Sequence, residues 1–166
     1  PAYLVTDEKN TGLYSGFMIP QYTGNDLAQK ICGLAHPVAN FNLTSANESE
    51  DIVSYGTAAA QKLLEQLHFL EKLTVVYMAV VGQGYSIARQ KHLDSRGVLS
   101  PESTTEKLFA EVYAHVAYPV VKDIPFDGIY ESLTALLHSG KLRAIIGHPL
   151  CNKLGIAPRV CREGGT

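Results

Sequence analysis

Hydrophobic and polar residues recur along this chain with the period of an α-helix, which predicts a mostly helical protein. The first predicted helix covers residues 17–34, and the His36-Pro37 pair ends it because a residue before proline avoids the α region. Two shorter helices are predicted at residues 100–116 and 128–137. The apolar positions that define the first helix are Phe17, Ile19, Leu27, Ile31 and Leu34.

Polar and glycine residues mark the ends of the two shorter helices. Ser100 suits an N-cap position, and Pro101 suits the first helical position that follows it. Asp127 is the predicted cap of the last helix, which Gly140 closes after its final turn. Residues 141–166 contain scattered prolines and glycines, so no element is predicted in this tail.

The longest predicted helix extends from about Asp51 to Tyr85, where no proline interrupts the pattern. Ser49 is placed to cap its start, and the Gly-Gln-Gly segment at 82–84 is expected to loosen its end. At ~1.5 Å per residue this helix spans roughly 50 Å, whereas a compact domain of this length has a radius of gyration near ~15 Å. Residues 73–81 are apolar on every face, so their burial requires other subunits or another part of the same polypeptide.

Composition limits the classes of protein to which the chain can belong. Its 166 residues are enough for one domain, and with 46% apolar and 18% charged residues a folded core is expected. The net charge of −2 argues against a general nucleic-acid binder and against binding to anionic membranes. No apolar run reaches the ~18 residues that suggest a membrane span. An odd number of cysteines without a paired framework indicates a reducing, cytoplasmic location.

Histidine and cysteine residues give only a weak indication of a metal site. His148, Cys151 and Cys161 are loosely spaced, whereas a structural zinc site needs four ligands, usually in two close pairs. The sequence therefore predicts no metal, and a stand-alone metalloenzyme is the alternative with the least support.

The polar segment at residues 44–51 is the strongest candidate for a functional site. It combines carboxylates and hydrogen-bonding side chains with the expected N-terminus of a helix. Such an arrangement can orient a polar substrate and hold a proton-accepting carboxylate against it. Helix capping by solvated acids is the simpler interpretation, and composition alone favours it.

Four short motifs follow one another in the first third of the chain. They are Ser15-Gly16-Phe17-Met18-Ile19, Ala35-His36-Pro37, Thr44-Ser45-Ala46-Asn47 and Glu50-Asp51-Ile52-Val53-Ser54. Together they resemble the C-terminal half of the histidine and aromatic amino acid ammonia-lyase family. The likeness continues to Gln83 and more weakly to residue 140, and the last ~25 residues carry none of it. One departure is the Glu48-Ser49 pair, which stands where the family has a single residue.

The resemblance implies a fold, an assembly and a cofactor. Family members are mostly helical homotetramers in which long helices of four subunits form a central bundle. Their electrophile, a methylidene-imidazolone (MIO), forms from an internal Ala-Ser-Gly triplet. This chain has no such triplet and none of the family's catalytic tyrosine segments. We therefore expect a C-terminal portion (a fragment, a processed piece or half of a split protein) whose missing N-terminal half carries the MIO.

The resemblance also assigns roles to residues of the polar segment. Glu50 matches a position that faces the active site, which is glutamate in histidases and usually glutamine in phenylalanine and tyrosine lyases. Glu50 is the expected catalytic residue, and Asn47 and Glu48 are expected to bind substrate. A carboxylate can pair with a substrate ammonium or imidazole, which favours histidine. The Ser-Tyr-Gly-Thr sequence at 54–57 instead resembles the Ser-Leu-Gly-Thr of aromatic lyases and aminomutases, which leaves the substrate open.

Two functions are consistent with this resemblance. The first is part of a lyase that eliminates ammonia from L-histidine or an aromatic L-amino acid, inactive as this chain alone. The second is a non-catalytic helical module that retains the family's bundle helix for oligomerisation, and an upstream Ala-Ser-Gly segment in the gene would distinguish the two. In both cases we expect an all-α, long-helix bundle, with residues 1–166 as one C-terminal helical domain of a homotetramer.

Overall fold

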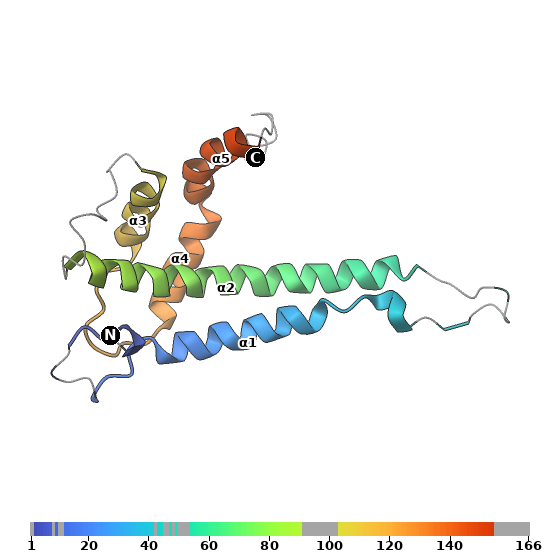
Figure 1. Cartoon of the computed structure of the whole chain (residues 1–166), viewed down its shortest axis with the longest axis horizontal. Coiled ribbons are helices and arrows are strands. Elements are labelled where there is room, and N and C mark those ends of the chain that lie inside the picture. Colours follow the sequence, from blue (N-terminus) through green and yellow to red (C-terminus); the bar gives the residue numbers. More distant parts are fainter. Residues whose placement is uncertain are drawn as a thin grey trace. The chain divides into compact units, whose positions relative to one another are not determined.

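The computed structural model describes residues 2–7, 9, 12–41, 43, 44, 47, 49, 54–90 and 103–154 (Figure 1). These residues form helices and their connections and contain no strand, so the predicted all-α class is confirmed. The α-helices are α1 (Met18–Leu34), α2 (Gly56–Gln90), α3 (Thr104–His115), α4 (Asp127–His138) and α5 (Lys141–Leu154). The short 3-10 turn η1 (Ala2–Leu4) lies before α1, and η3 (Val38–Phe41) lies after it.

The fold divides into two compact units. The first unit combines Pro1–Gln21 with Val75–Thr166, and the second unit is Tyr22–Thr74. Both boundaries fall inside helices, since one lies within α1 and the other within α2. Each unit therefore contains a segment of both helices.

The core of the first unit forms where α3, α4 and α5 pack against one another. Leu133 and Leu136 of α4 are fully buried, and Val75 and Ala79 bring one side of α2 into the same cluster. Burying a large apolar side chain is worth ~1.5–3 kcal/mol, so this cluster is a main source of the unit's stability. Its buried members are Phe17, Val75, Ala79, Val112, Val116, Ile129, Leu133, Leu136 and Leu142.

The second unit pairs segments of α1 and α2, joined by the connection that contains η3. The Lys30 ammonium lies 5.6 Å from the ring centroid of Phe69, and Gln66 donates a hydrogen bond to the Ile31 carbonyl oxygen at 3.2 Å. These contacts run in opposite directions along the two helices, which makes the pair antiparallel. Large apolar side chains on this part of α2 stay between 49% and 67% exposed, namely Leu63, Leu64, Leu67 and Leu70.

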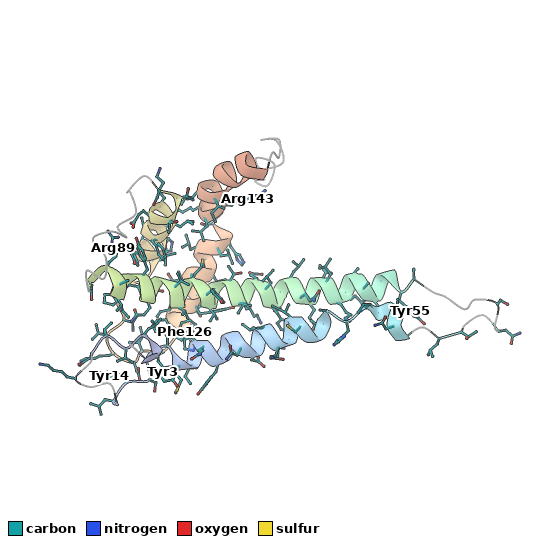
Figure 2. The ribbon with its side chains drawn as sticks, viewed as in Figure 1. Tyr3, Tyr14, Tyr55, Arg89, Phe126 and Arg143 are labelled. Carbon is teal, nitrogen blue, oxygen red and sulfur yellow. The ribbon has the colours of Figure 1, made fainter. Side chains whose placement is uncertain are left out.

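The start of α2 differs from the prediction. The helix begins at Gly56, because Tyr55 just before it adopts a left-handed backbone conformation (φ 46°) that a right-handed helix cannot include (Figure 2). The sequence had suggested Ser49 as the cap of α2. In the structure Ser49 lies in an earlier turn and does not cap this helix. Asp51, the predicted first-turn residue, lies outside the described residues.

The end of α2 was also predicted wrongly. The helix continues through the Gly-Gln-Gly segment to Gln90. A Cβ atom on Gly82 would lie 2.9 Å from ring atoms of Tyr118, so this glycine permits close packing against a neighbouring segment. Gln83 is fully buried and hydrogen-bonded. Both residues have tertiary roles within an intact helix.

The cap of α3 lies later than predicted. Ser103 holds the N-cap position, and its hydroxyl accepts a hydrogen bond from the Glu106 backbone N–H at 3.2 Å. The predicted cap, Ser100, lies outside the described residues. A serine three residues before a glutamate is a common start signal, so the real cap also has a local sequence signature.

The predicted C-terminal end of α4 is correct, whereas its predicted N-cap is wrong. Phe126 holds the N-cap position without a side-chain hydrogen bond, so Asp127 is the first helical residue rather than the cap. At the other end Gly140 adopts φ of 75°, which closes α4 as predicted. Helix α5 then occupies much of the tail in which no element was predicted.

Candidate functional site

The structure describes one of the three predicted site residues. Asn47 is exposed in a turn and has a left-handed backbone conformation, with φ of 55°. Asparagine adopts this conformation more readily than most residues, so the sequence is compatible with the turn. Glu48 and Glu50 lie outside the described residues, and their roles remain predictions.

The connection that carries these residues is held at its base by two side chains of α2. The Lys62 ammonium donates a hydrogen bond to the His36 carbonyl oxygen, and Gln66 Nε2 donates to the Ile31 carbonyl oxygen at 3.2 Å. The last carbonyl groups of a helix lack partners within the helix. These two bonds therefore satisfy acceptors at the end of α1 and just beyond it. The sequence alone did not predict them, because they depend on how α1 pairs with α2.

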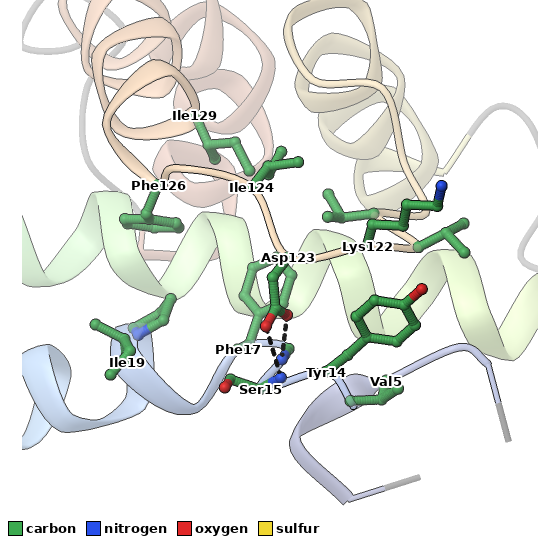
Figure 3. A pocket seen from close by; sticks show the side chains of 14 residues that line it. Val5, Tyr14, Ser15, Phe17, Ile19, Lys122, Asp123, Ile124, Phe126 and Ile129 are labelled. Carbon is green, nitrogen blue, oxygen red and sulfur yellow. Dashed lines mark hydrogen bonds between the residues drawn. The ribbon is translucent and has the colours of Figure 1, made fainter. Parts of the chain in front are cut away.

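A separate cavity of about 260 Å³ lies within the first unit (Figure 3). Its walls are mostly apolar, with the Asp123 carboxylate pointing toward the residues that precede α1. The lining residues are Val5, Tyr14, Ser15, Gly16, Phe17, Ile19, Pro20, Val120, Val121, Lys122, Asp123, Ile124, Phe126 and Ile129.

Asp123 fixes the backbone that leads into α1. Its carboxylate accepts hydrogen bonds from the Ser15 N–H at 2.8 Å and from the Gly16 N–H at 2.9 Å. These bonds favour the charged form and lower the pKa of Asp123 below its usual value. Gly16 has φ of 55°, and a Cβ atom there would lie 2.5 Å from the Tyr3 carbonyl oxygen. Because both carboxylate oxygens hold backbone amides, we assign Asp123 to structure rather than to catalysis.

Gln83 joins three parts of the first unit. Its side-chain amide nitrogen donates to the Leu4 carbonyl at 3.0 Å and to the Val120 carbonyl at 2.9 Å. Its side-chain oxygen accepts from the Val120 N–H at 2.8 Å. One buried amide thus holds the N-terminal segment and the segment after α3 against α2.

Aromatic residues and one carboxylate connect α2 with α3. The Tyr85 hydroxyl donates to the Glu106 carboxylate, and Arg89 forms an ion pair with the same group at 3.3 Å. The rings of Tyr85 and Phe109 stack with centroids 3.9 Å apart. The hydrogen bond to Glu106, with burial, raises the pKa of Tyr85, and burial raises the pKa of Tyr113 to about 12. These phenols are therefore protonated near neutral pH and are unsuited to act as bases.

The described residues were compared with the requirements of a metal site and of a membrane-spanning helix. No three histidine, cysteine, aspartate or glutamate side chains described here come together as a metal site requires. The side chains of His148, Cys151 and Cys161 lie outside this description. Among the described helices, none is both long enough and apolar enough to cross a bilayer.

Comparison with known proteins identifies the family. The family model described as aromatic amino acid lyase matches residues 1–114. The chain belongs to this family. The match to the aromatic amino acid lyase family covers the residues of all four motifs, and the predicted relationship is confirmed.

Individual members of the family match over most of this chain. Histidine ammonia-lyase from Treponema denticola is 31% identical over 133 residues, which are 80% of this chain and 24% of that protein. Histidine ammonia-lyase from Shewanella oneidensis is 32% identical over 158 residues, which are 95% of this chain and 27% of that protein. The chain spans about a quarter of the length of the curated relatives that it matches.

A solved member of the family shares the fold. The crystal structure of histidine ammonia-lyase from Trypanosoma cruzi matches with a TM-score of 0.70 and 26% sequence identity. The match covers 89% of this chain and 27% of that chain. The helical fold of this chain therefore matches part of that protein.

Proposed function

We propose that this chain is the C-terminal part of an ammonia-lyase that converts L-histidine or an aromatic L-amino acid to an α,β-unsaturated acid. The family match over residues 1–114 supports the reaction class. Relatives named histidine ammonia-lyase favour histidine as the substrate, as does a glutamate at position 50. In this proposal residues 1–166 act as one C-terminal helical domain of the enzyme.

Glu50 is the proposed catalytic residue of this chain. A carboxylate can pair with the substrate ammonium or imidazole and can accept a proton, whereas the amide of glutamine offers no charge. Asn47 and Glu48 precede it and are proposed to bind the polar groups of the substrate. The exposure of Asn47 supports this role, because an exposed side chain is accessible to a substrate.

An MIO cannot form from this chain, because its sequence contains no Ala-Ser-Gly triplet. In the proposed enzyme, residues outside this chain contribute the group, which supplies the electrophile for ammonia loss. The residues of this chain bind the substrate, orient it and accept a proton. We therefore expect no ammonia release from this chain alone.

An exposed apolar face on α2 supports a homo-oligomer, with a tetramer as the proposed state. Val75, Val76 and Ala79 are buried within the chain, whereas Tyr77 is 65% exposed and Val81 is 45% exposed. Exposed apolar residues recur on one face with the three- and four-residue spacing of a helix–helix contact, namely Leu63, Leu67, Leu70, Tyr77 and Val81. A cytoplasmic location belongs to the same proposal and rests on the unpaired pattern of cysteines.

The second candidate function is a non-catalytic oligomerisation module, which the same exposed face of α2 would serve. The two candidates differ in what the rest of the gene encodes. An Ala-Ser-Gly segment upstream of this sequence supports the enzyme, and its absence from the gene and from any partner subunit supports the module.

The Glu50→Gln variant of the full-length protein tests the proposed enzyme. Glutamine keeps the size of the side chain and removes its charge, so turnover of histidine should fall while the Tm changes little. Steady-state rates with histidine, tyrosine and phenylalanine, measured from urocanate or cinnamate absorbance, give the substrate class. Unchanged rates with a lowered Tm would assign Glu50 a purely structural role.

A further inference from the structure

The cavity of the first unit is an apolar hollow that lies open to solvent. It has a volume of about 260 Å³ and is formed mainly by side chains from residues 14–20 and 120–129 (Figure 3). Three of its apolar side chains are about half exposed, namely Ile19 at 57%, Val121 at 50% and Ile124 at 52%. Removing apolar surface from water is favourable, so the hollow favours an apolar occupant.

We propose that this hollow receives an apolar side chain from the polypeptide that precedes this chain in the full-length subunit. The inference rests on the proposed function, in which this chain is the C-terminal part of a longer enzyme. The matched residues make up 24% of one curated relative and 27% of another. Most of the proposed subunit therefore lies outside this chain and needs surfaces on it against which to pack.

The N-terminal segment brings such an occupant close to the hollow. Val5 lines the hollow, and the Phe17 N–H donates a hydrogen bond to the Tyr3 carbonyl oxygen at 2.9 Å. In the proposed enzyme, residues joined ahead of η1 are thus tethered beside the hollow. A short tether raises the effective concentration of an attached group to about the millimolar range. This tether favours an occupant from the same subunit over one from a second copy.

The size and polarity of the hollow fit a protein side chain better than a free ligand. Ligand pockets usually enclose about 300–1,000 Å³, and this hollow is smaller. Lys122 and Asp123 are exposed beside its apolar residues, and an apolar centre with a polar rim is typical of protein interfaces. Both carboxylate oxygens of Asp123 already accept backbone N–H groups, which favours an uncharged occupant.

The walls of the hollow are held in place by contacts of their own. Asp123 joins one wall to the other through the backbone N–H groups of Ser15 and Gly16. The rings of Phe17 and Phe126, one from each wall, meet edge to face with centroids 6.3 Å apart. A site that is formed in advance loses little conformational freedom when it is filled, so more of the gain from burial contributes to binding.

Thiol labelling at the edge of the hollow tests whether it is covered. Ile124→Cys is prepared in this chain and in the full-length protein that contains it, and peptide mass spectrometry follows maleimide labelling at position 124. We expect labelling to be about ten-fold or more slower in the full-length protein than in this chain. The matched control is Glu131→Cys at an exposed position of α4, where the two rates should agree within about two-fold. Equal rates at position 124, or equal protection at both positions, would overturn the inference.

Photo-crosslinking identifies the occupant. The photoreactive residue p-benzoylphenylalanine is placed at position 124 of full-length protein assembled from unlabelled and nitrogen-15-labelled subunits. A crosslink to residues encoded upstream of this chain, with both peptides carrying the same isotope, is the expected result. A crosslink to a second copy, or none to the upstream residues, would overturn the inference.

The inference and the proposed function can fail separately. A full-length protein that releases ammonia from histidine or an aromatic amino acid, but labels rapidly at position 124, would overturn the inference and leave the proposed function standing. A full-length protein that is protected at position 124 but has no ammonia-lyase activity would support the docking and contradict the proposed function.

Discussion

The side chain of Gln83 and the backbone of Val120 are joined by two hydrogen bonds, one in each direction, at 2.8 and 2.9 Å. The Gln83 side chain has no exposed surface, and its two hydrogen bonds with Val120 are partly buried. The amide of Gln83 thus replaces, for Val120, the backbone partner that a regular helix or strand would have supplied.

Replacing Gln83 with leucine should destabilise the first unit strongly. The change leaves partly buried polar backbone groups of Val120 and Leu4 without their partner, and such a group costs up to ~1–3 kcal/mol when it is fully buried. We expect the free energy of unfolding to fall by about 2–4 kcal/mol in urea titrations followed by far-ultraviolet circular dichroism. Gln61→Leu, at an exposed position of the same helix, should change it by less than about 0.5 kcal/mol. Equal effects of the two substitutions would contradict a role for this hydrogen-bonded junction.

Two glycine-to-alanine substitutions should change the stability of the chain in opposite directions. Gly82→Ala places a methyl group 2.9 Å from the Tyr118 ring and should destabilise the chain by about 1–3 kcal/mol. Gly33→Ala in α1 meets no atom within 4 Å and should stabilise the helix by up to about 1 kcal/mol. Thermal melts of the two variants check the pair, and a stabilising Gly82→Ala would show that Tyr118 does not need this space.

The bonds of Asp123 predict a pH-dependent contribution to stability. Its folded pKa lies below the ordinary value of 3.8, so its stabilising effect is complete above that value and is lost as pH falls through the folded pKa. Asp123→Asn should lower the Tm at neutral pH, and the difference from the unmodified chain should close in acid. Glu131→Gln, an exposed change on α4, serves as the control. A Tm difference for Asp123→Asn that stays constant into acid would exclude this carboxylate as the source.

Charged residues on the exposed face of α2 should weaken the proposed assembly. Leaving a leucine in water costs ~1.5–3 kcal/mol relative to burying it, so a face with several leucines gains from a partner. Leu67→Glu combined with Leu70→Glu should lower the molar mass measured by multi-angle light scattering, whereas Gln61→Glu should not. A well-folded monomer of the unmodified chain at micromolar concentration would contradict the proposal.

Local sequence patterns were sufficient to predict those helices and helix ends that are determined by residues close together in the sequence. The predicted helix at 17–34 corresponds to α1, and Gly140 ends α4 as expected, because periodicity and a left-handed glycine are properties of a short segment. The predicted start of α2 was wrong because Tyr55 adopts a left-handed conformation, which for a bulky residue has no sequence signature.

Contacts between distant residues could not be predicted in the same way. Asp123 binds Ser15 and Gly16 across more than a hundred residues of sequence, and nothing near Asp123 identifies its partners. Gly82 was interpreted as a helix-loosening residue because its real neighbour, Tyr118, is brought to it only by the fold. For the candidate site, the motifs predicted the segment and the family, whereas Lys62 and Gln66 emerged only from the pairing of two helices.

The stacked rings between α2 and α3 give this chain a built-in optical probe. It contains no tryptophan, so tyrosine dominates its near-ultraviolet absorption and emission. Tyr85 and Tyr113 are held in fixed ring contacts within the first unit, whereas Tyr22 of the second unit is 56% exposed. Near-ultraviolet circular dichroism depends on such immobilised rings and therefore reports the packing of the first unit. Comparing it with the far-ultraviolet signal would show whether both units melt together.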